Sequence, residues 1–222
     1  LAIHGFGPAL VVLEWTFIFL PILFHGIVGV LLLVGMVPNN YHYPFEANWR
    51  YTAQRVSAVI LVFFILYHVF HMHGWFHFDW WLAMAEPLGG AQFRPYNAGS
   101  SAGLALQNML VALFYAIGVL AGVFHFVNGI WTAGITWGVW TRPAAMRRAL
   151  AACMGLGALL LAVGLGALWG MREVGTGSAY AEALEAENRM YHAAVEAGAI
   201  SENEHKRTVG HESDDSGAQG EN

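Results

Sequence analysis

The chain of 222 residues contains a single cysteine, Cys153. One cysteine excludes an intrachain disulfide, a zinc site or iron–sulfur cluster built from cysteine ligands, and a haem attached covalently through a C-x-x-C-H motif. Any iron that the chain carries must therefore be held non-covalently, through histidine or methionine.

Charged residues are also scarce, at 11% of the chain against 57% hydrophobic residues. Four stretches, at residues 9–36, 52–76, 106–140 and 147–170, contain enough apolar residues to cross a bilayer core, which takes about 20 residues of helix. This composition predicts an all-α integral membrane protein, a transmembrane helix bundle with four spans. Its surroundings should be membrane lipid, and no nucleic-acid partner is expected.

The few charges divide the chain into two parts. Residues 1–172 carry a net charge of +3, whereas residues 173–222 carry −8. The first part is predicted to be the transmembrane bundle and the second an acidic, soluble tail. Within the tail, the Ala- and Glu-rich stretch 178–199 predicts a surface helix, and residues 201–222 are predicted to be disordered.

Arginine is concentrated around two of the three connections between spans. Arg50 and Arg55 lie at the first of these, and Arg142, Arg147 and Arg148 at the other. Cytoplasmic loops collect arginine and lysine, so these two connections should face the cytoplasm and the 77–105 connection the other side. Both termini, the tail included, would then lie outside. Because the sequence starts at Leu1 without an initiating methionine or signal peptide, we expect a further helix upstream.

Two histidines lie deep inside apolar stretches, and each has glycine one helical turn away on its own face. Gly29 follows His25, and Gly122 and Gly129 flank His125. An ionisable residue inside a membrane is usually functional, and small neighbours leave room for a flat macrocycle. Both histidines lie about 20–25 Å from the cytoplasmic ends of helices that run in the same direction. We therefore predict that His25 and His125 bind one haem iron from opposite sides.

A third intramembrane histidine, His68, lies 13 residues after Arg55. That spacing is about 20 Å along a helix, which places His68 beyond the midplane toward the outer side. A hydrogen bond to a neighbouring helix would explain it, but three such histidines on three consecutive spans favour haem ligation. His68 cannot reach the iron of the first pair and would need a second ligand, most naturally from the upstream helix.

Several short runs share their order and spacing with a known family. They are Leu13-Glu14, Phe19-Leu20-Pro21 and His25-Gly26; Gln54-Arg55-Val56 and Tyr67-His68-Val69; Phe124-His125-Phe126, Asn128-Gly129-Ile130-Trp131 and Thr136-Trp137-Gly138. Together they resemble the di-haem cytochrome b subunit of bacterial succinate dehydrogenase and fumarate reductase. The resemblance covers residues 9–170, which is nearly everything except the acidic tail.

The resemblance implies five helices and two bis-histidine b haems in the complete subunit. His25 and His125 resemble the ligands of the inner haem, near the cytoplasmic side, and His68 resembles one ligand of the outer haem. The family's fourth histidine belongs to a first helix that this sequence lacks. One haem would then be fully ligated by this chain.

The implied function is electron transfer and anchoring in the bacterial cytoplasmic membrane. Such subunits bind a flavoprotein and an iron–sulfur subunit, and their haems relay electrons between the iron–sulfur subunit and a quinone, here menaquinone by resemblance. Bis-histidine ligation fills both axial positions of the iron, which suits a relay rather than a catalyst. No residue of the chain is expected to bind a dicarboxylate or to be catalytic.

Two further residues have alternative interpretations. Glu14 is either an interfacial carboxylate that reaches water or a proton acceptor for quinol oxidation near the outer haem. Arg55 either follows the general excess of cytoplasmic arginine or pairs with a haem propionate.

Two rival functions remain open on the sequence alone. One is the haem b anchor of another membrane oxidoreductase, of the formate dehydrogenase or hydrogenase type, against which only the Gln54-Arg55 and His125–Trp131 neighbourhoods count. The other is a transporter with a histidine proton relay, which predicts polar residues along several spans. The third and fourth apolar stretches contain almost none.

Overall fold

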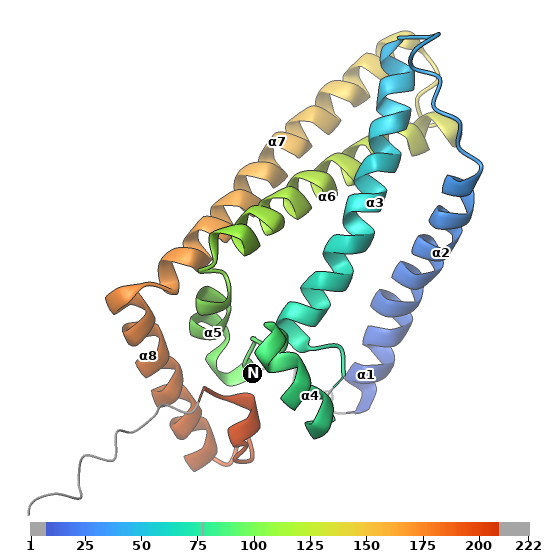
Figure 1. Cartoon of the computed structure of the whole chain (residues 1–222). Helices are drawn as coiled ribbons and strands as arrows, with labels where there is room; N and C mark the ends of the chain where they lie inside the picture. Colours follow the sequence, from blue (N-terminus) through green and yellow to red (C-terminus); the bar gives the residue numbers. More distant parts are fainter. Residues whose placement is uncertain (1–7, 77, 209–222) are drawn as a thin grey trace, which may run out of the picture. The chain divides into compact units, whose positions relative to one another are not determined.

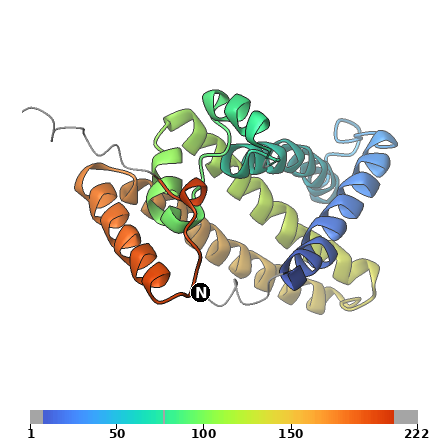
Figure 2. The same cartoon turned by 90° about the horizontal axis from the view of Figure 1, so that it is seen from below.

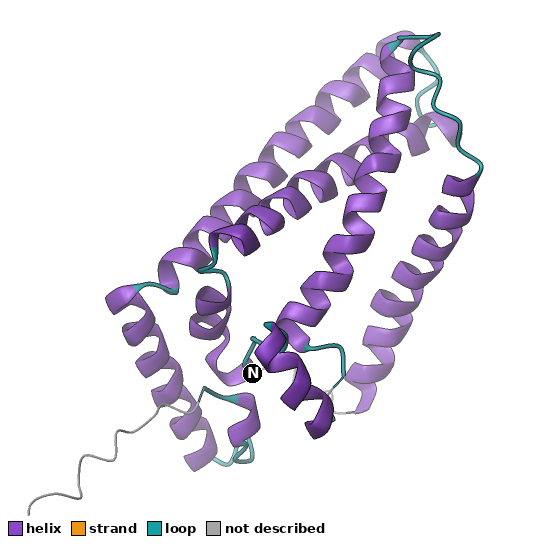
Figure 3. Ribbon diagram, viewed as in Figure 1, coloured by secondary structure: helices purple, strands orange, loops and turns teal. Residues whose placement is uncertain are grey.

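The computed structural model describes residues 8–76 and 78–208, and within them every regular element is a helix (Figures 1 and 3). Four helical stretches are long and apolar enough to cross a membrane: Val12–Val34, Glu46–His73, Met109–Thr136 and Pro143–Val174. The prediction of an all-α chain with four spans is confirmed. The chain is a multi-pass membrane protein.

The chain forms two compact units, divided at Phe64, Gly118 and Leu160. The first contains α1 (Pro8–Glu14), the π-helix η2 (Trp15–Phe19), α2 (Leu20–Val34) and parts of α3 (Glu46–His73), α6 (Met109–Thr136) and α7 (Pro143–Val174). The second contains the remaining parts of these three helices, α4 (Asp79–Ala85), η3 (Glu86–Leu88), η4 (Pro95–Asn97), α5 (Ala98–Ala105), α8 (Gly177–Glu196) and η5 (Glu204–Lys206).

A π turn interrupts the first span just before His25. Pro21 has no backbone N–H and its ring would clash with the carbonyl four residues earlier, so a regular α-helix cannot run through it undisturbed. The chain widens over Trp15–Phe19, and the Leu20 N–H donates to the Trp15 carbonyl, five residues back. Pro21 lies one turn before His25, and the helix accommodates it by a π turn over the preceding residues Trp15–Phe19.

In the first unit, the close approach of α3 and α6 depends on a small residue. A Cβ at Gly118 would overlap the Phe64 ring, whereas one at Gly157 would make ordinary van der Waals contact with Val127 at 3.4 Å. In contrast, none of the described residues of α2 is buried. Most side chains of this apolar helix are therefore exposed in this structure.

In the second unit, the end of α3 is capped by residues 91–93. The N–H groups of Ala91, Gln92 and Phe93 donate to the carbonyls of Phe70, His71 and Met72 at 2.9–3.0 Å. These carbonyls belong to the last turn, where the helix itself supplies few donors, although the Phe70 carbonyl also accepts from the Gly74 N–H at 2.8 Å. The 77–105 connection, expected as a loop, contains α4 and α5 because it has apolar and small residues to pack as well as turn residues.

The acidic tail begins with α8, which covers most of the predicted helix and packs against α5 (Figure 2). The Glu187 carboxylate accepts hydrogen bonds from the Gly99 N–H at 2.7 Å and from the Ser100 hydroxyl at 2.6 Å, so it caps the first turn of α5. The fully buried Asn97 donates to the Asn188 side chain.

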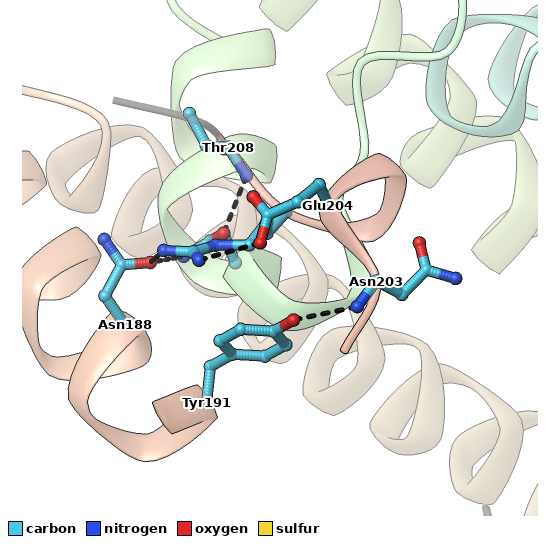
Figure 4. A network of polar contacts seen from close by, with 7 residues as sticks. Asn188, Tyr191, Asn203, Glu204 and Thr208 are labelled. Atoms are coloured by element: carbon cyan, nitrogen blue, oxygen red, sulfur yellow. Dashed lines mark hydrogen bonds and ion pairs between the residues drawn. The ribbon is translucent and has the colours of Figure 1, made fainter. Parts of the chain in front are cut away.

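Residues 201–208 differ from the disorder predicted for residues 201–222. Figure 4 shows the Tyr191 hydroxyl accepting from the Asn203 N–H at 2.9 Å, and the Thr208 N–H donates to Asn97 at 2.7 Å. The Arg207 guanidinium lies over the Tyr191 ring. The polar composition of this segment does not predict these contacts, because each depends on a specific buried partner elsewhere in the chain. Residues 209–222 lie outside the described part.

Candidate functional site

The two histidines of the predicted pair face each other in the first unit. His25 extends from α2 and His125 from α6, and their ring centres lie 6.1 Å apart with the ring planes nearly perpendicular, at 85°. The two positions are separated by 100 residues of sequence. The fold therefore brings together the two side chains that depth along the helices had paired.

The separation of the two rings fits a shared metal ion. A metal–imidazole bond is about 2.0 Å long and a ring nitrogen lies about 1.1 Å from the ring centre, so two imidazoles on opposite sides of one metal place their centres about 6.2 Å apart. In the described part of the chain, no group of three or more His, Cys, Asp or Glu could hold a metal ion. A macrocycle such as haem would supply the other ligands of a metal held between His25 and His125.

The ring of His125 is oriented by α3. Its Nδ1 lies 3.2 Å from the Gln54 carbonyl oxygen and 3.3 Å from the Ser57 hydroxyl. A carbonyl only accepts, so this contact favours the tautomer with the proton on Nδ1. Nε2 then carries the lone pair that a metal requires, an arrangement typical of metal-binding histidines.

A polar network between α3 and α6 holds this arrangement in place. The Gln54 amide donates to the His125 carbonyl at 3.0 Å and accepts from the Asn128 amide at 2.7 Å. Asn128, which is 4% exposed, in turn accepts from the Arg50 guanidinium at 3.0 Å. Arg50 also lies over the Trp131 ring, 3.9 Å from its centre. Polar side chains in an apolar layer thus satisfy one another across the two helices.

The glycines near the pair have different surroundings. A Cβ at Gly29 would meet no heavy atom within 4 Å, whereas one at Gly122 would lie 3.6 Å from Leu61 and one at Gly129 would lie 3.7 Å from Gln54. Gly29 thus leaves open space beside α2, as a flat group would require. Gly122 and Gly129 adjoin α3, and the predicted haem contact of all three glycines stays a prediction.

The third histidine, His68, lies in a cluster within the second unit. Its Nδ1 is 3.1 Å from the Tyr115 hydroxyl, and the same hydroxyl is 2.9 Å from Nδ1 of His71, one turn further along α3. The Tyr67 ring stacks on His71, with centres 5.2 Å apart and an interplanar angle of 12°. Hydrogen bonding and haem ligation need not compete at His68, because the contact uses only one of its nitrogens.

An apolar hollow of about 220 Å³ lies next to this cluster. Its lining residues are Tyr67, Leu110, Val111 and Phe114. Tyr67 therefore contacts His71 and Tyr115 in the cluster and also borders the hollow.

Arg55 and Glu14 are both half-buried in the first unit. The Arg55 guanidinium lies 3.2 Å from the centre of the Tyr51 ring and donates to the Tyr51 carbonyl. Glu14 is the last residue of α1, directly before the π turn. Neither position decides between the two interpretations given to each residue.

Four apolar spans, a histidine pair at metal-bridging distance and a backbone-oriented imidazole define a class, the multi-pass membrane protein with a candidate haem-binding site. Comparison with known proteins adds a particular relative. The chain is 31% identical over 135 residues to the succinate dehydrogenase cytochrome b558 subunit of Bacillus subtilis (strain 168). It is therefore a homologue of that subunit, which confirms the family resemblance predicted from the sequence.

The aligned region covers 61% of this chain and 59% of the relative's length. No protein-family model matches the chain, and no solved structure gives a significant match.

Proposed function

We propose that the chain is the membrane-anchor cytochrome b subunit of a succinate:quinone oxidoreductase. In this role it would pass electrons between an iron–sulfur subunit and quinone in the membrane. The observation that carries the proposal is the 6.1 Å separation of the His25 and His125 rings, in a chain homologous to a cytochrome b subunit.

In the proposed inner site, His25 and His125 would hold haem b, which would supply reversible one-electron transfer. The Gln54 carbonyl would accept the Nδ1 proton of His125, which would leave its Nε2 lone pair free to bind the haem. Arg55 would pair with a haem propionate if it left the Tyr51 ring on which it lies.

His68 is proposed as one ligand of a second, outer haem b. Its partner ligand would come from an additional helix, in keeping with two haems in the complete subunit. Glu14 would accept a proton during quinol oxidation, because two-electron quinone chemistry also moves two protons. We propose menaquinone as the quinone.

The partners proposed for the chain are the flavoprotein and iron–sulfur subunits of the same complex. The connections at residues 39–52 and 141–148 carry arginine, and the positive-inside tendency supports a position for them at the cytoplasmic face, where these partners would bind. In this orientation the C-terminal tail would lie on the outer side of the bacterial cytoplasmic membrane.

A reduced-minus-oxidised optical spectrum tests the proposal. The full-length subunit, purified with its complex, should show the α-band of a low-spin b-type haem, and succinate should reduce at least part of it. A spectrum without haem would favour the histidine-relay transporter. A haem reduced by formate or hydrogen but not by succinate would identify the anchor of another oxidoreductase and contradict the proposal.

A further inference from the structure

The Tyr115 hydroxyl lies between two imidazoles on successive turns of α3. It is 3.1 Å from Nδ1 of His68 and 2.9 Å from Nδ1 of His71. Tyr115 is 7% exposed and His71 is 4% exposed, so little water competes for these contacts. The three groups form one short hydrogen-bonded chain.

The number of protons restricts how this chain is arranged. A tyrosine hydroxyl has one proton and can donate to only one of the two nitrogens. For both contacts to be hydrogen bonds, at least one imidazole must carry its proton on Nδ1 and donate to the hydroxyl oxygen. That imidazole then has its lone pair on Nε2, the nitrogen that would bind a metal.

We propose that Tyr115 is a positioning residue for the His68 ligand, an inference that rests on the proposed haem-binding function. In this arrangement His68 donates from Nδ1 to the Tyr115 oxygen, and the Tyr115 hydroxyl donates to Nδ1 of His71. His71 is buried and stacked on Tyr67, whereas His68 is half-buried, so His68 has more room beside it for a large flat group. His71 is therefore assigned to the supporting role.

The proposed hydrogen bond has an electronic consequence. An acceptor for the Nδ1 proton makes the imidazole a stronger donor to the metal, which stabilises oxidised iron more than reduced iron. Removing the hydroxyl should favour the reduced haem. A tenfold change in the oxidised-to-reduced ratio, or about 59 mV for one electron, corresponds to a hydrogen bond about 1.4 kcal/mol stronger with oxidised iron than with reduced iron.

The test compares Tyr115→Phe with Tyr67→Phe in the full-length subunit, assembled with its partners. Both variants keep an aromatic ring in the same cluster, but only Tyr115→Phe removes the hydroxyl between the two histidines. Redox titration of each haem, together with low-temperature electron paramagnetic resonance, should show the outer haem shifted to a more positive potential in Tyr115→Phe alone. The inner haem should stay unchanged. Equal outer-haem potentials in Tyr115→Phe and the wild type would overturn the inference.

A second pair of variants tests which histidine is the ligand. His68→Leu should remove the outer haem, whereas His71→Leu should retain it with an altered potential. The reverse result would overturn the assignment. A wild-type complex without any haem would contradict the proposed function itself, while a wild type with the inner haem alone would overturn only the role of Tyr115.

Discussion

Asn128 offers the most specific perturbation of the inner site that leaves both histidines in place. It is neither of the two proposed haem-binding histidines, yet it joins the Gln54 amide to the Arg50 guanidinium across α3 and α6. Asn128→Leu keeps a side chain of similar size and removes both interhelical hydrogen bonds. We expect looser attachment of α3 at Gln54, and therefore of the His125 ring that the Gln54 backbone orients.

The expected magnitude follows from the number of bonds lost. Interhelical hydrogen bonds in membranes contribute about 0.6 kcal/mol on average and up to about 1.7 kcal/mol. Loss of two such bonds should reduce the stability of the site by about 1–3 kcal/mol. The value should lie toward the upper end, because the donor of one bond is charged and Asn128 is only 4% exposed. A loss of this size lowers the temperature at which the complex releases haem without preventing assembly.

A double-mutant cycle with Gln54→Leu measures the interaction itself. Haem release on heating is followed optically for the wild type, each single variant and the double variant. The two changes should be less than additive, because either one already breaks the bond that joins the residues. Thr132→Val is the control, since the Thr132 hydroxyl donates to carbonyls of its own helix, one turn away. It should leave haem release nearly unchanged.

Strictly additive effects of Asn128→Leu and Gln54→Leu would show that the two side chains do not interact. An Asn128→Leu variant as stable as the wild type would show that the network does not hold the site. Either result would refute the positioning role assigned to these residues.

Two further predictions concern packing and the tail. Gly118→Ala should destabilise the first unit by about 1–3 kcal/mol, because its Cβ would overlap the Phe64 ring. Gly155→Ala is the control and should be tolerated, since its Cβ would meet no heavy atom within 4 Å. Thermal unfolding in detergent compares the two variants. Equal losses would contradict the packing. Glu187→Ala should weaken the cap on α5 by about 0.5–2 kcal/mol and make α8 more sensitive to limited proteolysis, and the exposed Glu185→Ala is its control. Identical cleavage rates would refute the capping role.

The sequence predicted those features that depend on one helix at a time. Apolar length located all four spans to within about six residues, because about 20 apolar residues suffice to cross a bilayer. Depth along two helices running in the same direction was also enough to pair His25 with His125, since residues at equal depth can meet whenever their helices are neighbours.

Features that depend on helix rotation were missed. The motifs that contain Gln54 and Asn128 assign neither residue a role, and Tyr115 belongs to none of the motifs. Their partners are set by the angle at which each helix faces its neighbour, which a single sequence does not specify. A polar residue at position 54, 115 or 128 within an apolar span was the available signal, because such groups require partners in lipid.

The acidic tail also makes specific contacts that its composition does not predict. Its acidic composition indicated a separate appendage, but Glu187 and Asn188 contact the residues at 97–100 that precede and begin α5. Composition reports the average character of a segment and cannot show that one carboxylate caps a particular helix.

The central claim is that His25 and His125 hold the same haem. The most direct measurement is the haem content of His25→Ala and His125→Ala, each in the full-length subunit with its complex, by pyridine haemochrome assay and redox titration. Both variants should lack the same haem, and both should retain some of the other one. A variant that keeps the wild-type number of haems, or two variants that lose different haems, would contradict the pairing.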